Sequence, residues 1–314
     1  MKVRFIINPI AGGKNRVREI SEAVSRVFSS DHGIYEVRVT GKKGDANALA
    51  RDAVAKGYDA LFACGGDGTL NEVASELVKT DVILGIVPAG SGNGLARALK
   101  IPWEPEAAVR LLKDGFIRRV DAGVVGGGKK GERYFFSTAG FGFDALLSKR
   151  YNERPASLRV RGVLPYVPIA LVEFFKYRPE NTLIMIDGKY RNFRPFILTV
   201  ANTEQYGSSA IIAPGAVPDD GLFDICIVED VSLFSAIRDL RKLFSGNIDT
   251  IGNFKRIKAG VLEVLRRKPG LVHADGEYFE GDKKVEIRNL PGALKILVKE
   301  GPEGMERAGG ADSA

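Results

Sequence analysis

The sequence predicts an α/β protein in which a Rossmann-like N-terminal nucleotide domain with a parallel sheet precedes a second, mostly antiparallel β-rich domain. Over about the first 120 residues, apolar runs of strand length alternate with amphipathic helical segments, as in βαβ units. After that point, short β-rich runs separated by turn sequences dominate. A chain of 314 residues also exceeds one typical core. We expect domains at 1–120 and 121–300 and a small, polar, flexible tail at 301–314.

The elements of the first domain follow from hydrophobic periodicity. Strands are predicted at residues 3–7, 35–39, 60–63 and 83–87. Helical periodicity runs from the turn at 8–14 through residue 27, and it recurs at 46–56, at 70–78 and from residue 94. Glycine-rich turns follow three of these strands. Because ligands bind outside the carboxyl ends of parallel strands, these turns predict a binding edge.

The second domain is punctuated by turns such as Asp187-Gly188 and Asp219-Asp220-Gly221. Its strands are predicted at residues 133–137, 182–186, 196–201, 223–228, 284–287 and 294–298. Helical stretches interrupt these strands near 165–177 and 232–244.

Composition excludes several classes of protein. Cys64 and Cys226 lie in apolar runs and indicate buried side chains, while His32 and His273 are too few for a histidine-rich metal centre. No stretch has the length and apolarity of a membrane-spanning helix, and the first strand begins without a signal-peptide pattern, so we expect a cytoplasmic protein. The net charge of +7 indicates a polyanionic partner. No nucleic-acid-binding motif is found, so nucleic acid is the least favoured partner.

The glycine loops carry the chemistry. The sequence GGDGTLNE at 65–72 joins a strand to a helix, where backbone N–H groups and the helix dipole favour phosphate. It combines glycines with an acid, a hydroxyl and a polar Asn-Glu step, a pattern that favours nucleotide binding over an ordinary turn. PAGSGNGLAR at 88–97 follows the next strand in the same way, and the loop at 8–14 lacks the full Walker A spacing. The nucleotide is expected to be ATP used for phosphoryl transfer.

Six motifs make the chain resemble the diacylglycerol kinase catalytic superfamily, which includes bacterial lipid kinases and sphingoid-base kinases. The motifs are NPIAGG at 8–13, GGDGTLNE at 65–72, PAGSGNGLAR at 88–97, AGFGFDA at 139–145, PDDGLFD at 218–224 and DGE at 275–277. The resemblance implies an NAD kinase/diacylglycerol kinase-like fold. It also implies an ATP- and Mg²⁺-dependent lipid kinase that phosphorylates the hydroxyl group of diacylglycerol or a related membrane lipid, with the lipid bound by the second domain.

The resemblance also implies roles for single positions. The residues expected to contact ATP are Asn8, Pro9, Ile10, Ala11, Gly12, Thr40, Gly65, Gly66, Asp67, Gly68, Thr69, Leu70, Asn71, Glu72, Gly90, Ser91 and Asn93. The DGE motif would supply the catalytic base, either Asp275 or Glu277. A structural Mg²⁺ would bind the side chain of Asp220 and the backbone carbonyls of Val217 and Leu222.

The residue types suit these roles. Phosphoryl transfer requires charge neutralisation and a carboxylate that accepts the proton of the attacking hydroxyl. Asp67 is expected to be catalytic by orienting Mg²⁺ or its water ligands. Asp275 and Glu277 alternate around a glycine, so both would face one side of an extended segment. The alternatives are a solvated hairpin turn for DGE and an ordinary surface turn for Asp219-Asp220-Gly221.

The acceptor remains open between several substrates. Gly94 stands where many diacylglycerol kinases carry an acid, and the GSGN form is closer to the sphingoid-base kinases. Leu146 and Leu147, however, stand where sphingosine kinases carry an acid. The alternatives are therefore a sphingoid-base kinase, then an NAD kinase, then a non-catalytic lipid- or nucleotide-binding regulator. A homodimer is left open.

A basic cluster precedes an apolar stretch at 163–175, and its members are Lys149, Arg150, Arg154, Arg159 and Arg161. This pattern predicts peripheral contact with an anionic membrane, on its inner face. The alternative is a core helix beside a solvated charged face.

Overall fold

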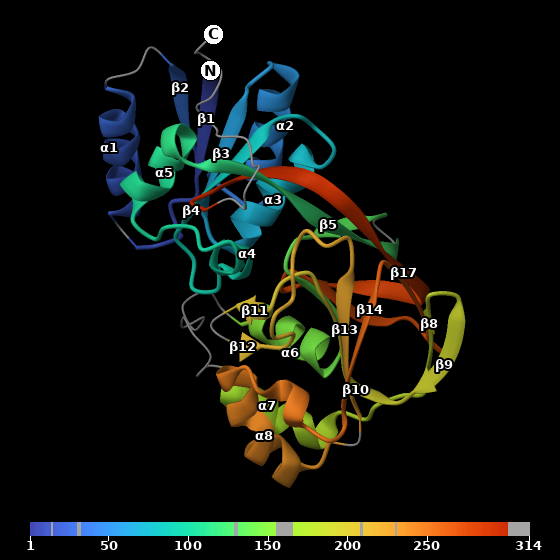
Figure 1. The fold of residues 1–314 in the computed structure, drawn as a ribbon. Helices are drawn as coiled ribbons and strands as arrows, with labels where there is room; N and C mark the ends of the chain where they lie inside the picture. Colours follow the sequence, from blue (N-terminus) through green and yellow to red (C-terminus); the bar gives the residue numbers. More distant parts are fainter. Residues whose placement is uncertain are drawn as a thin grey trace. The chain divides into compact units, whose positions relative to one another are not determined.

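The computed structural model describes residues 1–13, 15–29, 33–128, 131–154, 166–207, 210–229 and 231–300. The chain folds into two compact units, Met1–Val120 together with the C-terminal part from Gly292, and Asp121–Pro291. Figure 1 shows both units and the labels used below. Each unit has its own sheet region and core.

A parallel sheet forms the centre of the first unit. Its strands are β2 (Ile34–Val39), β1 (Lys2–Ile7), β3 (Ala60–Gly65) and β4 (Ile83–Pro88), in that order. Every residue of β3 and β4 is buried, as expected for parallel strands covered on both faces, whereas β2 lies at an edge and is largely exposed. The far end of β17 (Glu277–Val298) adds a further parallel strand beside β4, with Lys295 opposite Ile83.

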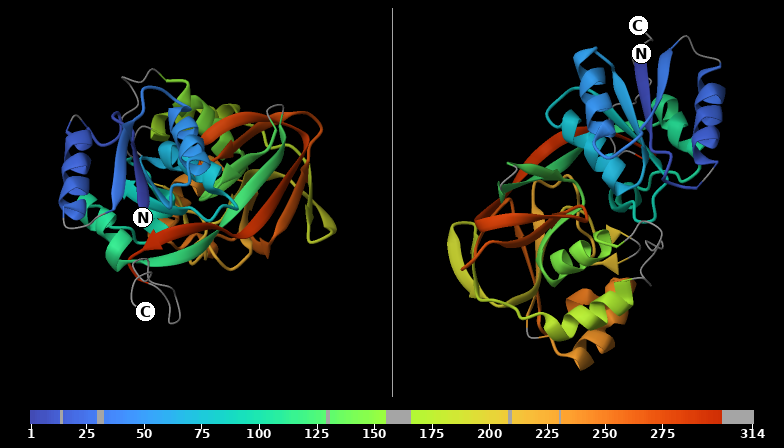
Figure 2. Two further views of the ribbon diagram at one scale, coloured as in Figure 1. Left: turned by 90° about the horizontal axis from the view of Figure 1, so that it is seen from above. Right: turned by 180° about the vertical axis from the view of Figure 1, so that it is seen from behind.

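Helices cover both faces of this sheet. They are α1 (Arg16–Phe28), α2 (Asp45–Ala55), α3 (Asp67–Leu77), α4 (Gly94–Ala98) and α5 (Pro105–Asp114). In α1 the buried residues Ile20, Ala23, Val24 and Val27 recur at helical spacing and form one apolar stripe. Helix α1 packs with α5, and α2 packs with α3 on the opposite face, as the left view of Figure 2 shows.

The second unit is mostly antiparallel, with the strand order β14-β13-β10-β7-β16-β17. These strands are β14 (Phe254–Ala259), β13 (Phe223–Glu229), β10 (Pro195–Ala201), β7 (Thr138–Gly142) and β16 (Gly270–Ala274). Further strands are β5 (Phe116–Gly128), β6 (Arg133–Phe135), β8 (Thr182–Ile186), β9 (Lys189–Phe193), β11 (Gln205–Gly207), β12 (Ala210–Ile211) and β15 (Val261–Leu265). Helices α6 (Phe143–Asn152), α7 (Tyr166–Lys176) and α8 (Leu233–Ser245) and the short 3₁₀ turn η2 (Ile248–Thr250) complete it.

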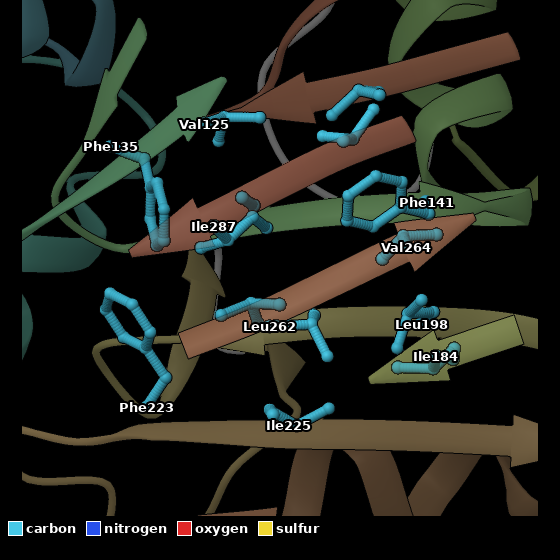
Figure 3. Packing of buried hydrophobic residues seen from close by; sticks show 14 of the residues in the cluster. Val125, Phe135, Phe141, Ile184, Leu198, Phe223, Ile225, Leu262, Val264 and Ile287 are labelled. Atoms are coloured by element: carbon cyan, nitrogen blue, oxygen red, sulfur yellow. The ribbon is translucent and has the colours of Figure 1, made fainter. Parts of the chain in front are cut away.

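The core of the second unit is aliphatic and aromatic. Side chains from strands far apart in the sequence meet in it, among them Phe135, Ile184, Leu198, Phe223 and Val264 (Figure 3). The alternating burial of β8 shows why such strands form a sheet with one packed face.

The fold class predicted from the sequence is confirmed: a parallel N-terminal sheet and an antiparallel second part. One assignment was wrong. The last strand, predicted at 294–298 within the second domain, pairs with β4 of the first unit, because Ile296 is registered with Leu84 along that strand. The predicted tail at 301–314 lies outside the described residues. Within the described ranges, every helix is too short or too polar to cross a membrane.

Candidate active site

Three loops meet at the carboxyl edge of the parallel sheet: the first loop follows β1, the second follows β3 and the third follows β4. The loop after β1 is tied to β3 because the Asn8 backbone N–H donates to Cys64 O at 2.9 Å. The loop after β4 is tied to the same strand, since the Ala89 N–H donates to Gly65 O at 2.8 Å. The Thr40 N–H, after β2, donates to Ile7 O at 2.9 Å. The structure therefore brings together the loop positions that the sequence predicts as an ATP site.

Glycine is required where the second and third loops touch. A Cβ atom on Gly90 would lie 2.5 Å from the Gly66 Cα and 3.0 Å from the Asn93 Oδ1. Backbones at this distance leave no room for a side chain. Gly68 differs, because no atom lies within 4 Å of the position that its Cβ would take. Packing within the protein therefore explains why residues 66 and 90 are glycine, but it does not explain why Gly68 is glycine.

Asp67 joins these two loops through both carboxylate oxygens. Oδ2 accepts the Asn93 N–H at 2.7 Å, and Oδ1 accepts the Gly94 N–H at 2.8 Å, at the start of α4. Burial raises the pKa of the Asp67 carboxyl, and these N–H groups oppose the rise. Gly94 contributes its backbone N–H at the position where many diacylglycerol kinases carry an acid. Asp67 thus holds the 90–94 loop in place.

Asn93 shapes the same loop from within. Its backbone has φ +53°, and its side-chain amide donates to Gly90 O at 2.6 Å. In the first loop, Asn8 Nδ2 donates to Thr69 Oγ1 at 2.9 Å, and Asn8 Oδ1 accepts the Ile10 N–H at 3.0 Å. Asn93 therefore stiffens its own loop, and Asn8 joins the loop after β1 to the start of α3.

The remaining predicted ATP-contact positions differ in exposure. The Leu70 side chain is buried in the core, so only its backbone could meet a ligand. Pro9, Ile10, Gly68 and Ser91 are exposed on the loops. Gly12 is also exposed, Gly65 is buried, and Ala11 and Asn71 are intermediate.

Glu72 caps a neighbouring helix. Its carboxylate accepts the Gly44 N–H at 3.0 Å and the Ala46 N–H at 3.2 Å, at the N-terminus of α2. Asp45 accepts the N–H groups of Gly41 and Lys42, which lowers the pKa of its carboxyl. The Glu72 carboxylate therefore orders the segment after Thr40.

Sequence reasoning missed Arg16, the first residue of α1. Its guanidinium donates to Pro88 O at 2.8 Å and so connects the helix after the first loop to the start of the third loop. A Cβ on Gly12 would lie 2.7 Å from its Cγ. The Nε of Arg16 is buried and has no hydrogen-bond partner among the described residues. The sequence feature that could have indicated this role is an arginine just after a glycine-rich turn. Lys14 of this turn lies outside the described residues.

In the second unit, the DGE motif forms the hairpin between β16 and β17. Asp275 (φ +46°) and Gly276 (φ +79°) both have positive φ, as a type I′ turn requires, and Ala274 pairs with Glu277. The expectation that Asp275 and Glu277 alternate along an extended segment was wrong, because the chain reverses at Asp275.

Backbone donors surround the Asp275 carboxylate. Oδ1 accepts the N–H groups of Ser137 at 2.8 Å and Thr138 at 3.1 Å, and Oδ2 accepts that of Phe136 at 2.9 Å. Asp275 thereby anchors the chain between β6 and β7 to the hairpin. Glu277 is half-buried at the first position of β17.

Helix α6 holds the same hairpin from the other side. Ser148 Oγ donates to Gly276 O in a short hydrogen bond, and Asn152 Nδ2 donates to the same oxygen at 2.9 Å. One turn earlier in the helix, Asp144 is fixed to the sheet by a Thr199 hydroxyl bond of 3.0 Å to its Oδ2. The hairpin position therefore depends on α6.

Asp144 lies over Gly140 of β7, where the sheet has no side chain. Gly140 pairs with Thr199 on β10 and with His273 on β16. A Cβ on Gly140 would lie 2.1 Å from Asp144 Oδ2 and 2.3 Å from His273 Nε2. Burial, and after it the Asp144 carboxylate, raise the pKa of Tyr206, whose hydroxyl lies 3.4 Å from Oδ2. Sequence reasoning considered His273 only as a metal ligand and missed this cluster, although AGFGFDA marks its glycine and its acid.

The Asp219-Asp220-Gly221 turn supplies oxygen atoms of the type that Mg²⁺ prefers. Asp220 Oδ2, however, accepts the Lys258 Nζ at 2.6 Å, and Oδ1 accepts the Leu222 N–H at 3.0 Å. This hydrogen bond, donated by Lys258 to Asp220, raises the pKa of Lys258. Val217 and Leu222 are exposed on this turn. Among the described residues, no group of three or more acidic, histidine or cysteine side chains could hold a metal ion.

The predicted basic cluster is described only in part. Arg150 Nε pairs with Glu173 at 3.0 Å, and Lys149 Nζ lies 3.8 Å from Glu153. Arg159 and Arg161 lie outside the described residues. Helix α7 is not a core helix, because Leu171, Val172 and Phe175 are exposed.

Comparisons with known proteins agree with this architecture. Residues 2–125 match the family model described as diacylglycerol kinase catalytic domain, and residues 137–298 match the YegS C-terminal NAD kinase beta sandwich-like domain. A diacylglycerol kinase of Mycobacterium tuberculosis is 32% identical over 302 residues, covering 94% of each chain. A protein of Chromohalobacter salexigens named probable lipid kinase YegS-like is 33% identical, covering 93% of each chain. The crystal structure of a Bacillus anthracis diacylglycerol kinase superposes with a TM-score of 0.69 at 20% identity, covering 95% of this chain and 97% of that one, and supports the fold.

Proposed function

We propose that this chain, which belongs to the diacylglycerol kinase and YegS-like lipid kinase family, transfers the γ-phosphoryl group of ATP to a hydroxyl group of diacylglycerol or a closely related membrane lipid. The observation that carries the proposal is the cradle at the edge of the parallel sheet. There, the backbones of Gly66 and Gly90 are in contact, and the Asp67 carboxylate accepts the N–H groups of Asn93 and Gly94. Such a rigid set of loops costs little to organise when a triphosphate binds.

The donor half of the reaction would take place at this cradle. The N-terminus of α3 begins at Asp67, so its first N–H groups and its dipole favour the phosphates. The open space at Gly68 would let a phosphate oxygen approach the backbone. Mg²⁺ would arrive with ATP and neutralise the charge that develops on the transferred group. Arg16, with its unpartnered Nε, adds a fixed positive charge beside the first and third loops.

For the acceptor half we assign the base to Glu277 and a positioning role to Asp275. Asp275 already accepts three backbone N–H groups, whereas Glu277 begins the strand directly after the turn. Glu277 would accept the proton of the lipid hydroxyl as that oxygen bonds to the γ-phosphorus. The bond from phosphorus to the ADP oxygen breaks in the same step, and ADP leaves with that electron pair.

The Asp219-Asp220-Gly221 turn is the proposed place of a structural Mg²⁺. The Asp220 carboxylate and the carbonyls of Val217 and Leu222 would hold it by oxygen atoms. Because Lys258 pairs with Asp220, the ion would compete with an ammonium group for this carboxylate. The ion would stiffen the turn and take no part in the transfer.

The acceptor lipid can be identified directly. Purified protein is incubated with labelled ATP, Mg²⁺ and, in separate reactions, diacylglycerol, monoacylglycerol, sphingosine, phosphatidylglycerol and NAD. We expect labelled phosphatidic acid, and its formation should be roughly 10²–10⁴-fold slower with the Glu277→Gln variant. Labelled sphingosine phosphate would favour the sphingoid-base branch, to which the GSGN loop is similar, and labelled NADP would overturn the lipid assignment. ATP binding without any labelled product would favour a regulator. We place the reaction in the cytoplasm, at the inner face of the membrane, where ATP and lipid meet.

A further inference from the structure

Helix α8 of the second unit packs Leu243 against the core of the unit and also presents a second row of apolar side chains outward. Phe234, Ile237 and Leu240 are spaced three residues apart and are between 46% and 76% exposed. The single buried residue of the helix is an acid, Asp239, which is 7% exposed. A surface helix of a globular protein ordinarily keeps its apolar side chains against the core and its acids outside, so the exposed apolar row and the buried acid of α8 are unusual.

This orientation belongs to a well-formed helix. Ser232 and Ser235 form a reciprocal capping box at its start, with hydrogen bonds of 2.9 and 3.1 Å. Gly246 ends the helix with φ +72°. Asp239 is held on the protein side by Arg238 at 2.6 Å and Lys242 at 3.2 Å. Asp239 and Leu243 are four residues apart and share one face of α8, and Leu243 packs against the core, so this face is turned toward the unit.

Helix α7 repeats the arrangement. Leu171, Val172 and Phe175 are between 44% and 61% exposed, whereas its acid, Glu173, is 7% exposed and pairs with Arg150 at 3.0 Å. Ile169 and Phe174 attach the other side of the helix to the unit, and the Phe174 ring lies 5.3 Å from that of Phe196. Both helices lie at the same end of the second unit in Figure 1 and in the right view of Figure 2.

The charges at these two helices are of one sign on the outside. Lys176 is exposed at the end of α7, and Arg238 and Arg241 are exposed on α8. The acids of both helices are the buried Glu173 and Asp239. Apolar side chains bordered by basic ones, with the acids withdrawn, match a bilayer that carries anionic lipids.

We propose that the outward faces of α7 and α8 are the surface by which this protein docks on an anionic lipid bilayer. The inference deepens the proposed function, because an enzyme that acts on a membrane lipid must reach it without a spanning helix among the described residues. Phe175, Phe234 and Ile237 enter the interface between headgroups and acyl chains. Arg241 and Lys176 lie against the headgroups.

A second copy of the chain fits this surface less well. Symmetric pairing would bring the exposed arginines of one α8 against those of the other, and like charges across an interface oppose association. A bilayer with anionic headgroups offers the opposite charge to every basic residue on both helices.

Vesicle binding without ATP tests the proposal. The full-length protein is sedimented with vesicles of phosphatidylcholine alone or of phosphatidylcholine with phosphatidylglycerol, at low and high salt. We expect binding to the mixed vesicles that weakens with salt. The triple variant Phe234→Ser, Ile237→Ser, Leu240→Ser and the double variant Leu171→Ser, Phe175→Ser should each reduce the vesicle partition coefficient by roughly tenfold or more. Arg241→Gln with Lys176→Gln should reduce binding to mixed vesicles only.

Matched controls use exposed apolar side chains elsewhere in the same unit. Tyr190→Ser on β9 and Val261→Ser on β15 should leave vesicle binding unchanged. A tryptophan reporter locates insertion: with Trp103→Phe, brominated lipids should quench the fluorescence of Phe234→Trp but not that of Tyr190→Trp. Circular dichroism verifies that every variant is folded.

Unchanged vesicle binding by both the α7 and α8 variants would overturn the proposal. So would a shift from dimer to monomer in these variants, measured by light scattering, with unchanged vesicle binding. Turnover of a water-soluble short-chain diacylglycerol is measured in parallel and should survive the surface variants. Absence of turnover in the native protein would count against the proposed function and would leave the binding result interpretable.

Discussion

Removing the Asp275 carboxylate is predicted to destabilise the second unit as well as to slow the reaction. In Asp275→Ala, the N–H groups of Phe136, Ser137 and Thr138 lose their acceptor, and all three residues are buried. At about 1 kcal/mol for each lost bond, the free energy of unfolding should fall by roughly 3 kcal/mol. For a unit of this size, that loss lowers Tm by roughly 6–12 °C.

Glu277→Gln provides the contrast. It changes one half-buried side chain at the start of β17 and should leave Tm within about 2 °C of the native value, since surface substitutions rarely exceed ~0.5 kcal/mol. Because Glu277 is the assigned base, however, its replacement by Gln should lower kcat by roughly 10²–10⁴-fold with little change in the affinity for ATP.

Scanning calorimetry, single-turnover kinetics and ATP-binding titrations are carried out on both variants. If Asp275→Ala melts like the native protein and loses only kcat, while Glu277→Gln remains active, then Asp275 is the base and its assigned positioning role is wrong. A fall in both Tm and kcat for Asp275→Ala, with a kcat effect alone for Glu277→Gln, supports the assignment.

Three further predictions concern other parts of the molecule. Gly90→Ala would place a Cβ 2.5 Å from the Gly66 Cα, where carbon atoms ordinarily stay about 3.5–4.0 Å apart, so the loops must separate and ATP affinity should fall by roughly tenfold or more. Gly68→Ala, which meets no atom within 4 Å, is the control for Tm; equal ATP affinity in Gly90→Ala and the native protein would contradict the cradle. Lys258→Met removes the ion pair to Asp220, so Mg²⁺ added without nucleotide should raise Tm more in this variant than in the native protein. If Mg²⁺ changes Tm in neither protein, the turn is not a metal site. Arg238 and Lys242 lower the pKa of Asp239 to about 2, below its unfolded value, so its stabilising contribution is complete above pH ~4 and is lost as the pH falls toward 2. The Tm difference between native protein and Asp239→Asn should follow that course, and a difference that persists at pH 2 would contradict it.

The acceptor side of the site illustrates how far sequence reasoning reaches. The DGE motif and the Asp-Gly turn within it are visible in the sequence, and a solvated hairpin was one of the two interpretations considered. The structure shows the hairpin, but its aspartate is bound by backbone N–H groups of the protein. The catalytic interpretation stays a prediction. The donors to Asp275 lie 137 to 139 residues away, and no local pattern indicates them.

The cluster around Gly140 shows the same limit. Its glycine and Asp144 belong to one motif, but Thr199 and His273 become its neighbours only through the pairing of β10, β7 and β16. The outward faces of α7 and α8 are a further case. Their helical periods are visible in the sequence, yet an amphipathic pattern does not say which side of the helix meets the protein.

By itself the sequence determined the βα units and the glycine loops at their carboxyl ends, since backbone conformation, helix period and strand alternation depend on neighbouring residues. It also predicted that Asp67 and the DGE motif carry the chemistry, which stays a prediction. Only the tertiary structure decided that Asp67 bonds the third loop, that Asp275 anchors β7 and that the end of β17 returns to β4, where Lys295 pairs with an aspartate 214 residues away. These contacts depend on strand register and on packing summed over the whole chain, which no short segment encodes.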